Sequence, residues 1–459
     1  MTDKKNRFKQ FIFGKTVVSS HPVSGDELEK LLVRGKKIKE NGSHPSQDQI
    51  MDILSGVSKA WADPGYAKRR EALKMLTEST GLGTELVEAI LNEFPGRIDP
   101  DNLEKKLAGE LGSPSIQDGL VTQDTTHARL TVQPVGQILH VAAGNAFLGC
   151  IESLIDGIIT KNVNFLKMST DRDFPVLFAE SIRQFDKKGI IADRLAILWW
   201  QGGDRTIENM FKHYMDRIIF WGGDDALSSW KKDLGQSTVL VQHGPKISFG
   251  VLSNAGLKAV KLSELTDRIV FDIVIWEQKA CNCPQMLFVE ESVPPEEMKR
   301  FIDSLADSFE KANDRFPPGK RLDDEYVEIL RTRELALAEH LATGQSTSVI
   351  GPETFDWTII YEEDPKGRKF ITSPLNRSIF IERYPSLRVL SDLLRDHSFY
   401  LQTVGYCLED REISEYGIAL SRLGVTRLCP FGVMAITTPG TPHDGSYALR
   451  DLTRVTVIE

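Results

Sequence analysis

The chain has 459 residues, of which 41% are hydrophobic and 26% are charged, and its formal net charge is −9. That length is enough for two or three domains with sizeable cores, and the negative charge argues against a nucleic-acid-binding protein. No apolar run approaches the ~20 residues of a membrane span, and the polar residues 1–7 lack the apolar segment of a signal peptide. Five cysteines cannot all pair within one chain, so we expect reduced thiols in a cytoplasmic protein.

Residues 1–130 have the apolar spacing of helices. Helical stripes occupy residues 26–39, 46–61, 66–78 and 84–94, and glycine- or proline-containing breaks separate them. Neither a GxGxxG motif nor a P-loop is present in the sequence. We therefore expect a mainly helical N-terminal part.

From residue 131 short apolar runs alternate with amphipathic helices. The runs are residues 135–143, 163–168, 194–200 and 217–221, and helical patterns follow at 147–159, 175–185, 206–215 and 225–234. This alternation predicts a parallel sheet covered on both faces, with ligands beyond the carboxyl ends of its strands. Those ends, residues 143–145, 167–171, 201–203 and 222–225, carry Gly, Asn, Lys, Ser and Asp, which suit phosphate and ribose groups. We expect residues 131–245 to form a dinucleotide-binding domain.

Residues 246–436 repeat the α/β pattern and are expected to form a catalytic domain. Strands are predicted at 249–252, 268–275, 357–361 and 378–381, and helices at 294–312 and 324–344. Residues 387–394, 404–407, 412–423, 427–429 and 433–436 would complete this unit. We expect residues 437–459 to return to the first domain or to a partner subunit. Their last part is rich in β-branched residues and predicts an edge strand.

A polar turn at residues 276–285 contains Cys281 and Cys283, and we expect it to follow directly on the predicted strand 268–275. A thiolate held in such a turn can attack a thioester or aldehyde carbonyl, and the resulting oxyanion needs hydrogen-bond donors. From the turn alone, two small buried hydrophobic side chains explain the cysteines equally well. A Cys-x-Cys metal site is disfavoured, because no second cysteine pair lies nearby in the sequence.

Four polar positions at the predicted strand ends and near the C-terminus each have a functional and a plain interpretation. Asn145 can donate to an oxyanion or cap a helix, and Lys167 can hold a ribose or phosphate or simply end a strand in solvent. The Gly222–Gly223 pair permits close approach of a phosphate but also suits an ordinary turn. The stretch His443–Asp444–Gly445 is either a loop over the active site or a turn.

The order of these features resembles the aldehyde dehydrogenase superfamily, and more closely its acyl-CoA reductase family, that of the bacterial bioluminescence fatty-acid reductases. The segments that carry the closer resemblance are residues 277–281 (Glu-Gln-Lys-Ala-Cys), 284–285, 157–163 and 443–445. The resemblance covers the chain from about residue 131 to the C-terminus. It implies an α/β, aldehyde-dehydrogenase-like fold, an acyl-CoA or acyl-carrier substrate, a homo-oligomer and an acyl-transferring partner enzyme.

The resemblance also implies a role for individual residues. Cys281 would be the nucleophile and Asn145 the oxyanion donor. The positions that would contact the dinucleotide are Lys167 at the adenosine ribose, Gly222 and Gly223 at the pyrophosphate, and Glu382 at the nicotinamide ribose.

Two departures from the superfamily pattern refine the expected reaction. The carboxylate that activates water in hydrolytic members is replaced by Gln242, although the neighbouring His243 could act as a base. The Glu that binds the ribose 2′-hydroxyl in many NAD-dependent members is replaced by Thr170, next to Ser169, which favours NADPH. We expect NADPH-dependent reduction of a fatty acyl thioester to the aldehyde through an acyl-cysteine. A hydrolytic aldehyde dehydrogenase and a non-catalytic acyl-binding subunit are the alternatives.

Overall fold

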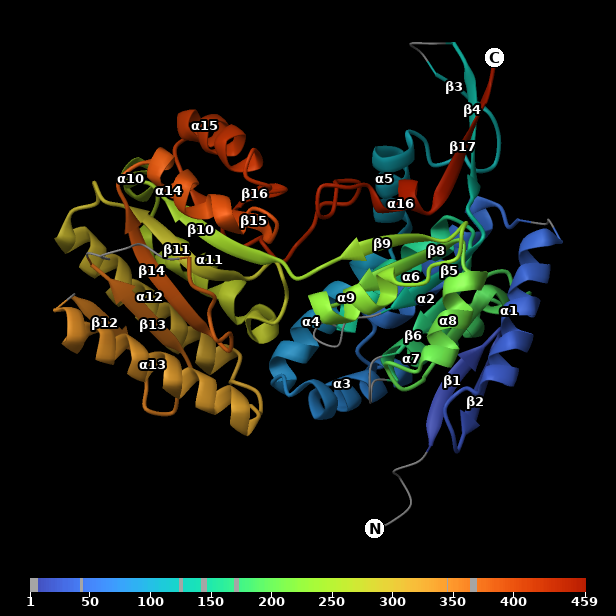
Figure 1. Ribbon diagram of the computed structural model, residues 1–459, viewed down its shortest axis with the longest axis horizontal. Helices are drawn as coiled ribbons and strands as arrows, with labels where there is room; N and C mark the ends of the chain where they lie inside the picture. The colour runs from blue at the N-terminus through green and yellow to red at the C-terminus, as the bar shows by residue number, and fades with distance from the viewer. Residues whose placement is uncertain are drawn as a thin grey trace. The chain divides into compact units, whose positions relative to one another are not determined.

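The computed structural model describes residues 7–41, 44–123, 127–141, 147–168, 173–344, 346–363 and 370–459. The chain forms two compact units (Figure 1). One comprises Met1–Thr80, Glu88–Gly244 and Thr438–Glu459, and the other comprises Gly81–Val87 and Pro245–Thr437. Within the described ranges no helix is long and apolar enough to span a membrane.

The N-terminal part is mainly helical, as the sequence predicts. Its helices are α1 (Gly25–Glu40), α2 (Gln47–Ala62), α3 (Ala67–Thr80), α4 (Thr84–Arg97) and α5 (Pro100–Leu111). Ser24 and Ser46 begin α1 and α2 as capping boxes, because each hydroxyl accepts a hydrogen bond from the backbone N–H three residues later. The sequence did not predict the hairpin of β1 (Phe8–Ile12) and β2 (Lys15–Ser19) that precedes them.

The first large sheet has the strand order β2-β1-β7-β6-β5-β8-β9. Its parallel strands are β5 (Gln137–Val141), β6 (Val163–Lys167), β7 (Leu195–Leu198), β8 (Arg217–Trp221) and β9 (Val239–His243). The chain moves outward from β5 in one direction through β6 and β7, and in the other through β8 and β9. Ligands of open α/β sheets bind at such a reversal of strand order, outside the carboxyl ends of the strands.

Helices cover both faces of this sheet. One face packs a hydrophobic core against α1, α8 (Arg205–Tyr214) and α9 (Asp224–Lys231). The other face meets α6 (Phe147–Ile159) and α7 (Phe174–Phe185). The near-continuous burial of the parallel strands follows from this double cover, and it explains why their sequences are short apolar runs.

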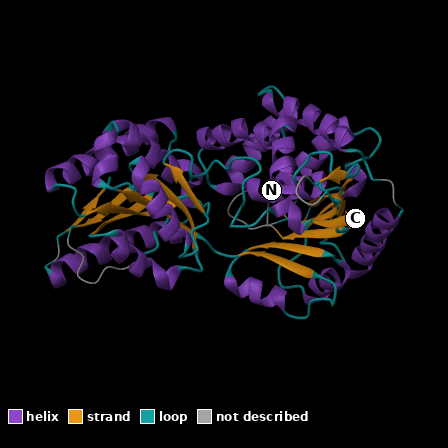
Figure 2. Cartoon of the chain, turned by 90° about the horizontal axis from the view of Figure 1, so that it is seen from above, coloured by secondary structure: helices purple, strands orange, loops and turns teal. Residues whose placement is uncertain are grey.

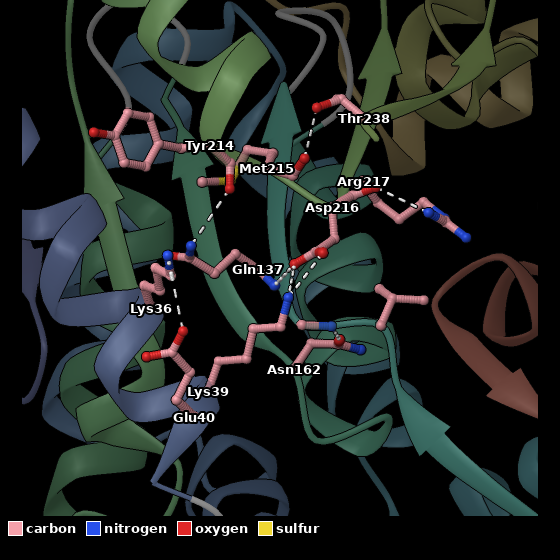
Figure 3. A network of polar contacts seen from close by, with 12 residues as sticks. Lys36, Lys39, Glu40, Gln137, Asn162, Tyr214, Met215, Asp216, Arg217 and Thr238 are labelled. Atoms are coloured by element: carbon pink, nitrogen blue, oxygen red, sulfur yellow. Dashed lines mark hydrogen bonds and ion pairs between the residues drawn. The ribbon is translucent and has the colours of Figure 1, made fainter. Parts of the chain in front are cut away.

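A polar network fixes the amino ends of β5 and β8 (Figure 3). The carboxylate of Asp216 accepts hydrogen bonds from the Lys39 ammonium at 2.7 and 2.8 Å and from the backbone N–H of Gln137 at 2.8 Å. The amide of Asn162 accepts from the Gly136 N–H and donates to the Leu452 carbonyl oxygen. These contacts tie the start of the central strand to both α1 and the C-terminal segment.

The C-terminal segment belongs to the first unit. After the short helix α16 (Ala448–Asp451), β17 (Thr453–Ile458) pairs antiparallel with β4 (Arg129–Pro134), which also pairs with β3 (Val121–Thr122). Figure 1 shows β17 beside β4 at the end of the chain. The predicted edge strand is therefore present.

The second unit contains another seven-stranded sheet, in the order β12-β13-β14-β11-β10-β15-β16. All neighbours are parallel except β12 and β13. The strands are β10 (Ile247–Leu252), β11 (Pro284–Glu290), β12 (Thr347–Ile350), β13 (Thr358–Glu362), β14 (Ser378–Tyr384), β15 (Leu401–Cys407) and β16 (Arg427–Pro430). Figure 2 shows helices on both sides of this sheet. They are α10 (Asn254–Ala259), α11 (Leu262–Val274), α12 (Pro295–Arg315), α13 (Asp323–Thr343), α14 (Leu387–Leu394) and α15 (Asp410–Ser421).

Two predictions for this unit were wrong. Residues 268–275 are not a strand, because α11 runs to Val274. The buried Leu265, Ile269 and Ile273 repeat every four residues and form one helical face, which the β-branched composition of the segment obscured. Residues 433–436 form turns rather than a regular element. The predicted α/β class is confirmed, because parallel strands alternate with helices in both units.

Candidate active site

The cysteine turn lies between α11 and the amino end of β11, so it precedes a strand rather than following one. Its first residues, 276–278, all have positive φ angles. The Cys281 carbonyl oxygen accepts a hydrogen bond of 2.7 Å from the hydroxyl of Ser248 at the start of β10. The same hydroxyl accepts from the backbone N–H of Thr403 in β15. The backbone at Cys281 is therefore anchored to two neighbouring strands.

The two cysteines of the turn have different surroundings. Cys281 is partly exposed, whereas Cys283 is fully buried, with its Sγ 3.3 Å from the Ile275 carbonyl oxygen. Burial raises the pKa of the Cys283 thiol well above its usual value, and the nearby Asp272 carboxylate acts in the same direction. A thiol in that state is a poor nucleophile. The sequence left open whether these cysteines are reactive thiols or small buried hydrophobic side chains. Cys283 fits the second interpretation, and Cys281 is the candidate for the first.

Three of the residues expected at the site lie outside the described ranges. They are Asn145, Ser169 and Thr170, which follow the carboxyl ends of β5 and β6 in sequence. Their expected roles as oxyanion donor and cofactor contacts remain predictions.

Lys167 is the last residue of β6 and lies at the carboxyl edge of the first sheet. Its ammonium group is 5.4 Å from the centre of the Trp200 ring, in a cation–π arrangement. Burial lowers the pKa of Lys167, and the carboxylate of Glu208 partly opposes this shift. The amine is thus held at the strand end with its charge only partly compensated by the protein, which suits a polar or anionic ligand.

Gly222 and Gly223 follow β8 and precede α9. A Cβ atom at Gly223 would have no heavy atom of a described residue within 4 Å, so a ligand can approach the backbone there. Gly223 precedes α9 without a side chain to cap it, and Asp224 and Asp225 place two carboxylates in the first turn. Those charges oppose a phosphate at the helix terminus, so a diphosphate near Gly223 would rely on backbone hydrogen bonds.

Two tryptophans near the carboxyl ends of β7 and β8 were not singled out from the sequence. The Nε1 atoms of Trp200 and Trp221 are both buried, and neither has a hydrogen-bond acceptor within the described residues. Buried donors of this kind normally have a partner. Together with Lys167 and the open space at Gly223, these indole N–H groups fit a ligand rich in acceptor oxygens, such as a dinucleotide. A tryptophan directly after an apolar strand was the available signal.

Glu382 is not placed near the cysteine turn. It is 2% exposed within β14 and pairs in register with Phe288, whereas the start of β14, at Ser378, is level with the start of β11. Four residues of strand separate these levels, which corresponds to about 13 Å. The role at the nicotinamide ribose that the resemblance implies for Glu382 therefore remains a prediction.

A histidine and an aspartate far apart in the sequence meet at the carboxyl end of β9. Nδ1 of His243 is 3.1 Å from Oδ2 of Asp444, and its ring stacks on Trp221 with centroids 3.8 Å apart. From the sequence, residues 443–445 were interpreted only as a loop or a turn, so their pairing with His243 was not predicted. A carboxylate on Nδ1 orients the imidazole and leaves Nε2 for proton transfer.

His443 lies beside this pair, with Nε2 3.6 Å from the same Asp444 oxygen. Among the described residues, His243, His443 and Asp444 are the group with metal-ligand spacing, all three ligand atoms lying within 4.8 Å of one another. The 3.1 Å contact is already that of a hydrogen bond between an imidazole and a carboxylate, so the arrangement is explained without an ion.

Comparison with known proteins identifies the family. The family model described as acyl-CoA reductase (LuxC) matches residues 43–455. The chain is 24% identical over 411 residues to the long-chain acyl-protein thioester reductase of Vibrio harveyi, covering 89% of this chain and 81% of that protein. It is 22% identical over 456 residues to the protein of the same name from Photobacterium phosphoreum, covering 98% of this chain and 87% of that one.

Solved structures of similar fold are aldehyde dehydrogenases. Aldehyde dehydrogenase 21 from Physcomitrella patens, in complex with succinate, superposes with a TM-score of 0.74 at 12% identity, covering 98% of this chain and 97% of that one. A mutant of aldehyde dehydrogenase C from Pseudomonas syringae, in complex with NAD⁺ and octanal, gives a TM-score of 0.73 at 11% identity, covering 100% of this chain and 98% of that one. The chain has the aldehyde dehydrogenase fold, belongs to the acyl-CoA reductase (LuxC) family, and is an oxidoreductase.

Proposed function

We propose that this protein reduces a fatty acyl thioester to the aldehyde through an acyl-cysteine on Cys281, with NADPH as the reductant. The observation that carries the proposal is the contrast within the cysteine turn. Cys281 is partly exposed on an anchored backbone, while Cys283 is buried with a raised pKa. Family membership supplies the reaction class.

In the first half-reaction the Cys281 thiolate attacks the acyl carbonyl carbon. The bond between that carbon and the donor sulfur breaks, and the donor leaves as a thiol after taking up a proton. Asn145 is the proposed side-chain donor to the oxyanion, on the resemblance alone, with a backbone N–H near Cys281 as its partner. The second half-reaction frees the thiolate of Cys281 as the aldehyde leaves. Reduced nicotinamide cofactor, when bound, supplies the hydride for that step.

We assign cofactor binding to the first unit. Lys167 at the end of β6 and the open backbone at Gly223 support this assignment. So do the indole N–H groups of Trp200 and Trp221, for which the described part of the chain supplies no acceptor. The preference for NADPH over NADH rests on Ser169 and Thr170, since neither side chain would repel a 2′-phosphate.

Replacement of the water-activating carboxylate by Gln242 favours a thiol rather than water as the partner of the acyl-enzyme. Gln242 in β9 is exposed and neutral, so it cannot act as a carboxylate base. The donor is then either acyl-CoA or an acylated protein. The names of the relatives from Vibrio harveyi and Photobacterium phosphoreum describe acyl-protein thioesters. We therefore propose that an acyl-transferring partner enzyme also serves as donor, and that the reductase assembles as a homo-oligomer.

The proposal is tested by following NADPH oxidation across acyl-CoA chain lengths, with the product aldehyde trapped and identified. A parallel assay replaces acyl-CoA by an acyl-carrier protein. Stoichiometric aldehyde with either donor supports the proposal. Production of fatty acid from aldehyde and NADP⁺, without any thiol acceptor, would replace it by a hydrolytic aldehyde dehydrogenase.

A further inference from the structure

Two stretches of the second unit have three consecutive non-glycine residues in the left-handed region. One is residues 276–278, which lead into the cysteine turn, and the other is residues 375–377, which lead into β14. L-residues visit this region singly, because Cβ approaches the following carbonyl oxygen, and each such residue costs about 1–2 kcal/mol. The φ angles are 63° at Trp276, 50° at Glu277, 59° at Gln278, 62° at Leu375, 52° at Asn376 and 63° at Arg377.

The local sequence does not favour this conformation at residues 276–278. Trp276, Glu277 and Gln278 include neither glycine nor asparagine, the residues that tolerate positive φ. Strain of this kind persists only where the surrounding structure determines it, and it concentrates at functional sites. The cause must therefore lie in tertiary contacts.

Those contacts join the two stretches to each other. The Arg377 guanidinium donates two hydrogen bonds to the Glu277 carboxylate, of 2.9 and 2.5 Å. The backbone N–H of Asn376 donates to the Glu277 carbonyl oxygen at 3.1 Å. The Gln278 amide accepts from the Ser378 N–H at 2.8 Å and donates to the Ser378 carbonyl oxygen at 2.9 Å. We call Glu277, Gln278, Arg377 and Ser378 the clamp.

The clamp also closes the loop that holds the thiol. The Gln278 Nε2 donates a second hydrogen bond, of 2.8 Å, to the carbonyl oxygen of Pro284. Gln278 and Pro284 lie three residues before and three residues after Cys281. Cys281 is thus the middle residue of a short loop whose two ends share one amide side chain.

The side chains of the clamp are buried, and two of them are charged. The Arg377 and Glu277 side chains are 0% and 4% exposed, and Gln278 is 1% exposed. Asn313 accepts a further hydrogen bond of 2.5 Å from Arg377. A buried ion pair adds little net stability compared with apolar packing, but it selects one geometry, because any other arrangement leaves a charge unpaired. Such a pair in a strained loop is better explained by positioning than by stability.

We propose that the clamp positions the Cys281 thiol for attack, with Glu277, Gln278 and Arg377 as positioning residues. The inference rests on the proposed role of Cys281 as nucleophile. Misplacement of a reacting atom by about 1 Å costs roughly 100-fold in rate. Loosening the clamp should therefore slow acylation of Cys281 far more than it weakens cofactor binding, which uses residues of the first unit.

The test compares Arg377→Lys with Arg333→Lys. Arg377→Lys keeps the charge but loses the two-pronged contact with Glu277. Arg333 is the matched control, since it lies in the same unit, is 9% exposed, and donates to Thr358, Pro352 and Trp357 rather than to the cysteine loop. For each variant the rate of acyl-Cys281 formation, the pH profile of Cys281 alkylation by iodoacetamide, NADPH affinity and thermal unfolding are measured.

We expect Arg377→Lys to slow acylation roughly 10- to 100-fold and to change the alkylation profile, with NADPH affinity unchanged. Arg333→Lys should leave both cysteine readouts within about twofold of the wild type at a similar loss of thermal stability. Equal effects of the two variants on acylation, or a wild-type rate in Arg377→Lys, would overturn the inference. If Arg377→Lys does not fold, Glu277→Asp replaces it. That change keeps both charges and shortens the acidic side chain by one methylene group.

Failure of the clamp and failure of the proposed function give different results. If Cys281→Ala abolishes acylation while Arg377→Lys acylates normally, the clamp inference is wrong and the nucleophile stands. If Cys281→Ala is still acylated, the nucleophile lies elsewhere and the proposed function itself is wrong.

Discussion

The two seven-stranded sheets present their candidate functional residues at opposite ends of their strands. In the first unit Lys167, Gly222 and His243 lie at or just beyond the carboxyl ends of β6, β8 and β9. In the second unit Cys281 precedes the amino end of β11. The first arrangement follows from the general behaviour of parallel α/β sheets, where ligands bind beyond the carboxyl ends.

The second arrangement has no such general rule behind it, and it requires dedicated support. That support is the anchoring of the Cys281 carbonyl oxygen by Ser248 and the clamp between residues 277–278 and 377–378. At the carboxyl ends of parallel strands, where ligands usually bind, the candidate residues are glycines and a lysine without special support. At the amino end of β11, where binding is less usual, the candidate residue is held by backbone with positive φ angles and by a buried ion pair. The predictions below probe this difference.

The largest effect is expected from the cysteines. Cys281→Ala should lower NADPH-dependent aldehyde formation roughly a thousandfold or more, since it removes the nucleophile. Cys283→Ala should retain acyl labelling, because its thiol is buried and its pKa is raised. Incubation of each variant with radiolabelled acyl-CoA, followed by denaturing gel electrophoresis, checks both expectations. Labelling of Cys281→Ala but not of Cys283→Ala would reverse the assignment within the turn.

The next effect concerns the stability of the second unit. Arg377→Met leaves the Glu277 carboxylate buried and unpaired, which should cost about 3–5 kcal/mol in the free energy of unfolding. Lys299→Ala removes an exposed ion pair with Asp303 on α12 and should cost less than about 0.5 kcal/mol. Urea denaturation measures both variants. A loss in Arg377→Met no greater than in Lys299→Ala would contradict the contrast between a buried clamp and ordinary surface charge.

A smaller effect should appear in the dependence of stability on pH, and it involves both units. Burial raises the pKa of Glu110 in the first unit and of Asp272 in the second, each to about 7. A carboxyl whose pKa is raised by folding stabilises the fold while it is protonated. Its contribution is therefore complete below a pH of about 4 and is lost as the pH rises through about 7.

We expect the free energy of unfolding to fall by about 2 kcal/mol per group between pH 5 and pH 8. Asp272→Asn and Glu110→Gln should each flatten part of this slope. Urea midpoints measured at pH 5, 6, 7 and 8 test the expectation. A stability that rises over this range, or a slope unchanged in both variants, would show that neither carboxyl is protonated in the fold.

The smallest effect is assigned to the carboxyl edge of the first sheet. Lys167→Met should weaken NADPH binding about tenfold, equivalent to about 1.4 kcal/mol, by removing one cation from the strand end. Acyl labelling of Cys281 in the absence of cofactor should remain unchanged. Quenching of tryptophan fluorescence by NADPH measures the first quantity. Unchanged NADPH affinity together with impaired labelling would contradict the assignment of cofactor binding to the first unit and of acylation to the second.

The regular parts of the fold were predictable because their patterns are local. The short apolar runs of β5 to β8 identified a buried parallel sheet, and the spacing of apolar residues predicted α1 and α2. Residues 268–275 were misassigned because a short, almost continuously apolar and β-branched segment fits a buried strand as well as a buried helix. The hairpin of β1 and β2 was missed because most of β2 is exposed, so no buried face shows in its sequence.

The candidate site was predictable only where its residues stand next to a motif. Cys281, Lys167 and the glycine pair were proposed from predicted strand ends, of which the one before Cys281 was wrong, and from the family resemblance. The clamp was not, since Glu277 and Arg377 are 100 residues apart and nothing in Trp-Glu-Gln indicates a positive φ. His243 and Asp444 are 201 residues apart and meet only through the return of the C-terminal segment. The role of Glu382, which lies within β14, rests on the resemblance of a short segment alone and stays a prediction.

The central claim is a covalent acyl-enzyme on one sulfur. The most direct measurement incubates the wild-type protein with a long-chain acyl thioester in the absence of cofactor and locates the adduct by peptide mass spectrometry. The account predicts a single acyl group on Cys281 that disappears on addition of NADPH, with an equal amount of aldehyde formed. An unmodified Cys281, an acyl group on another residue, or release of the acyl group as fatty acid would contradict it.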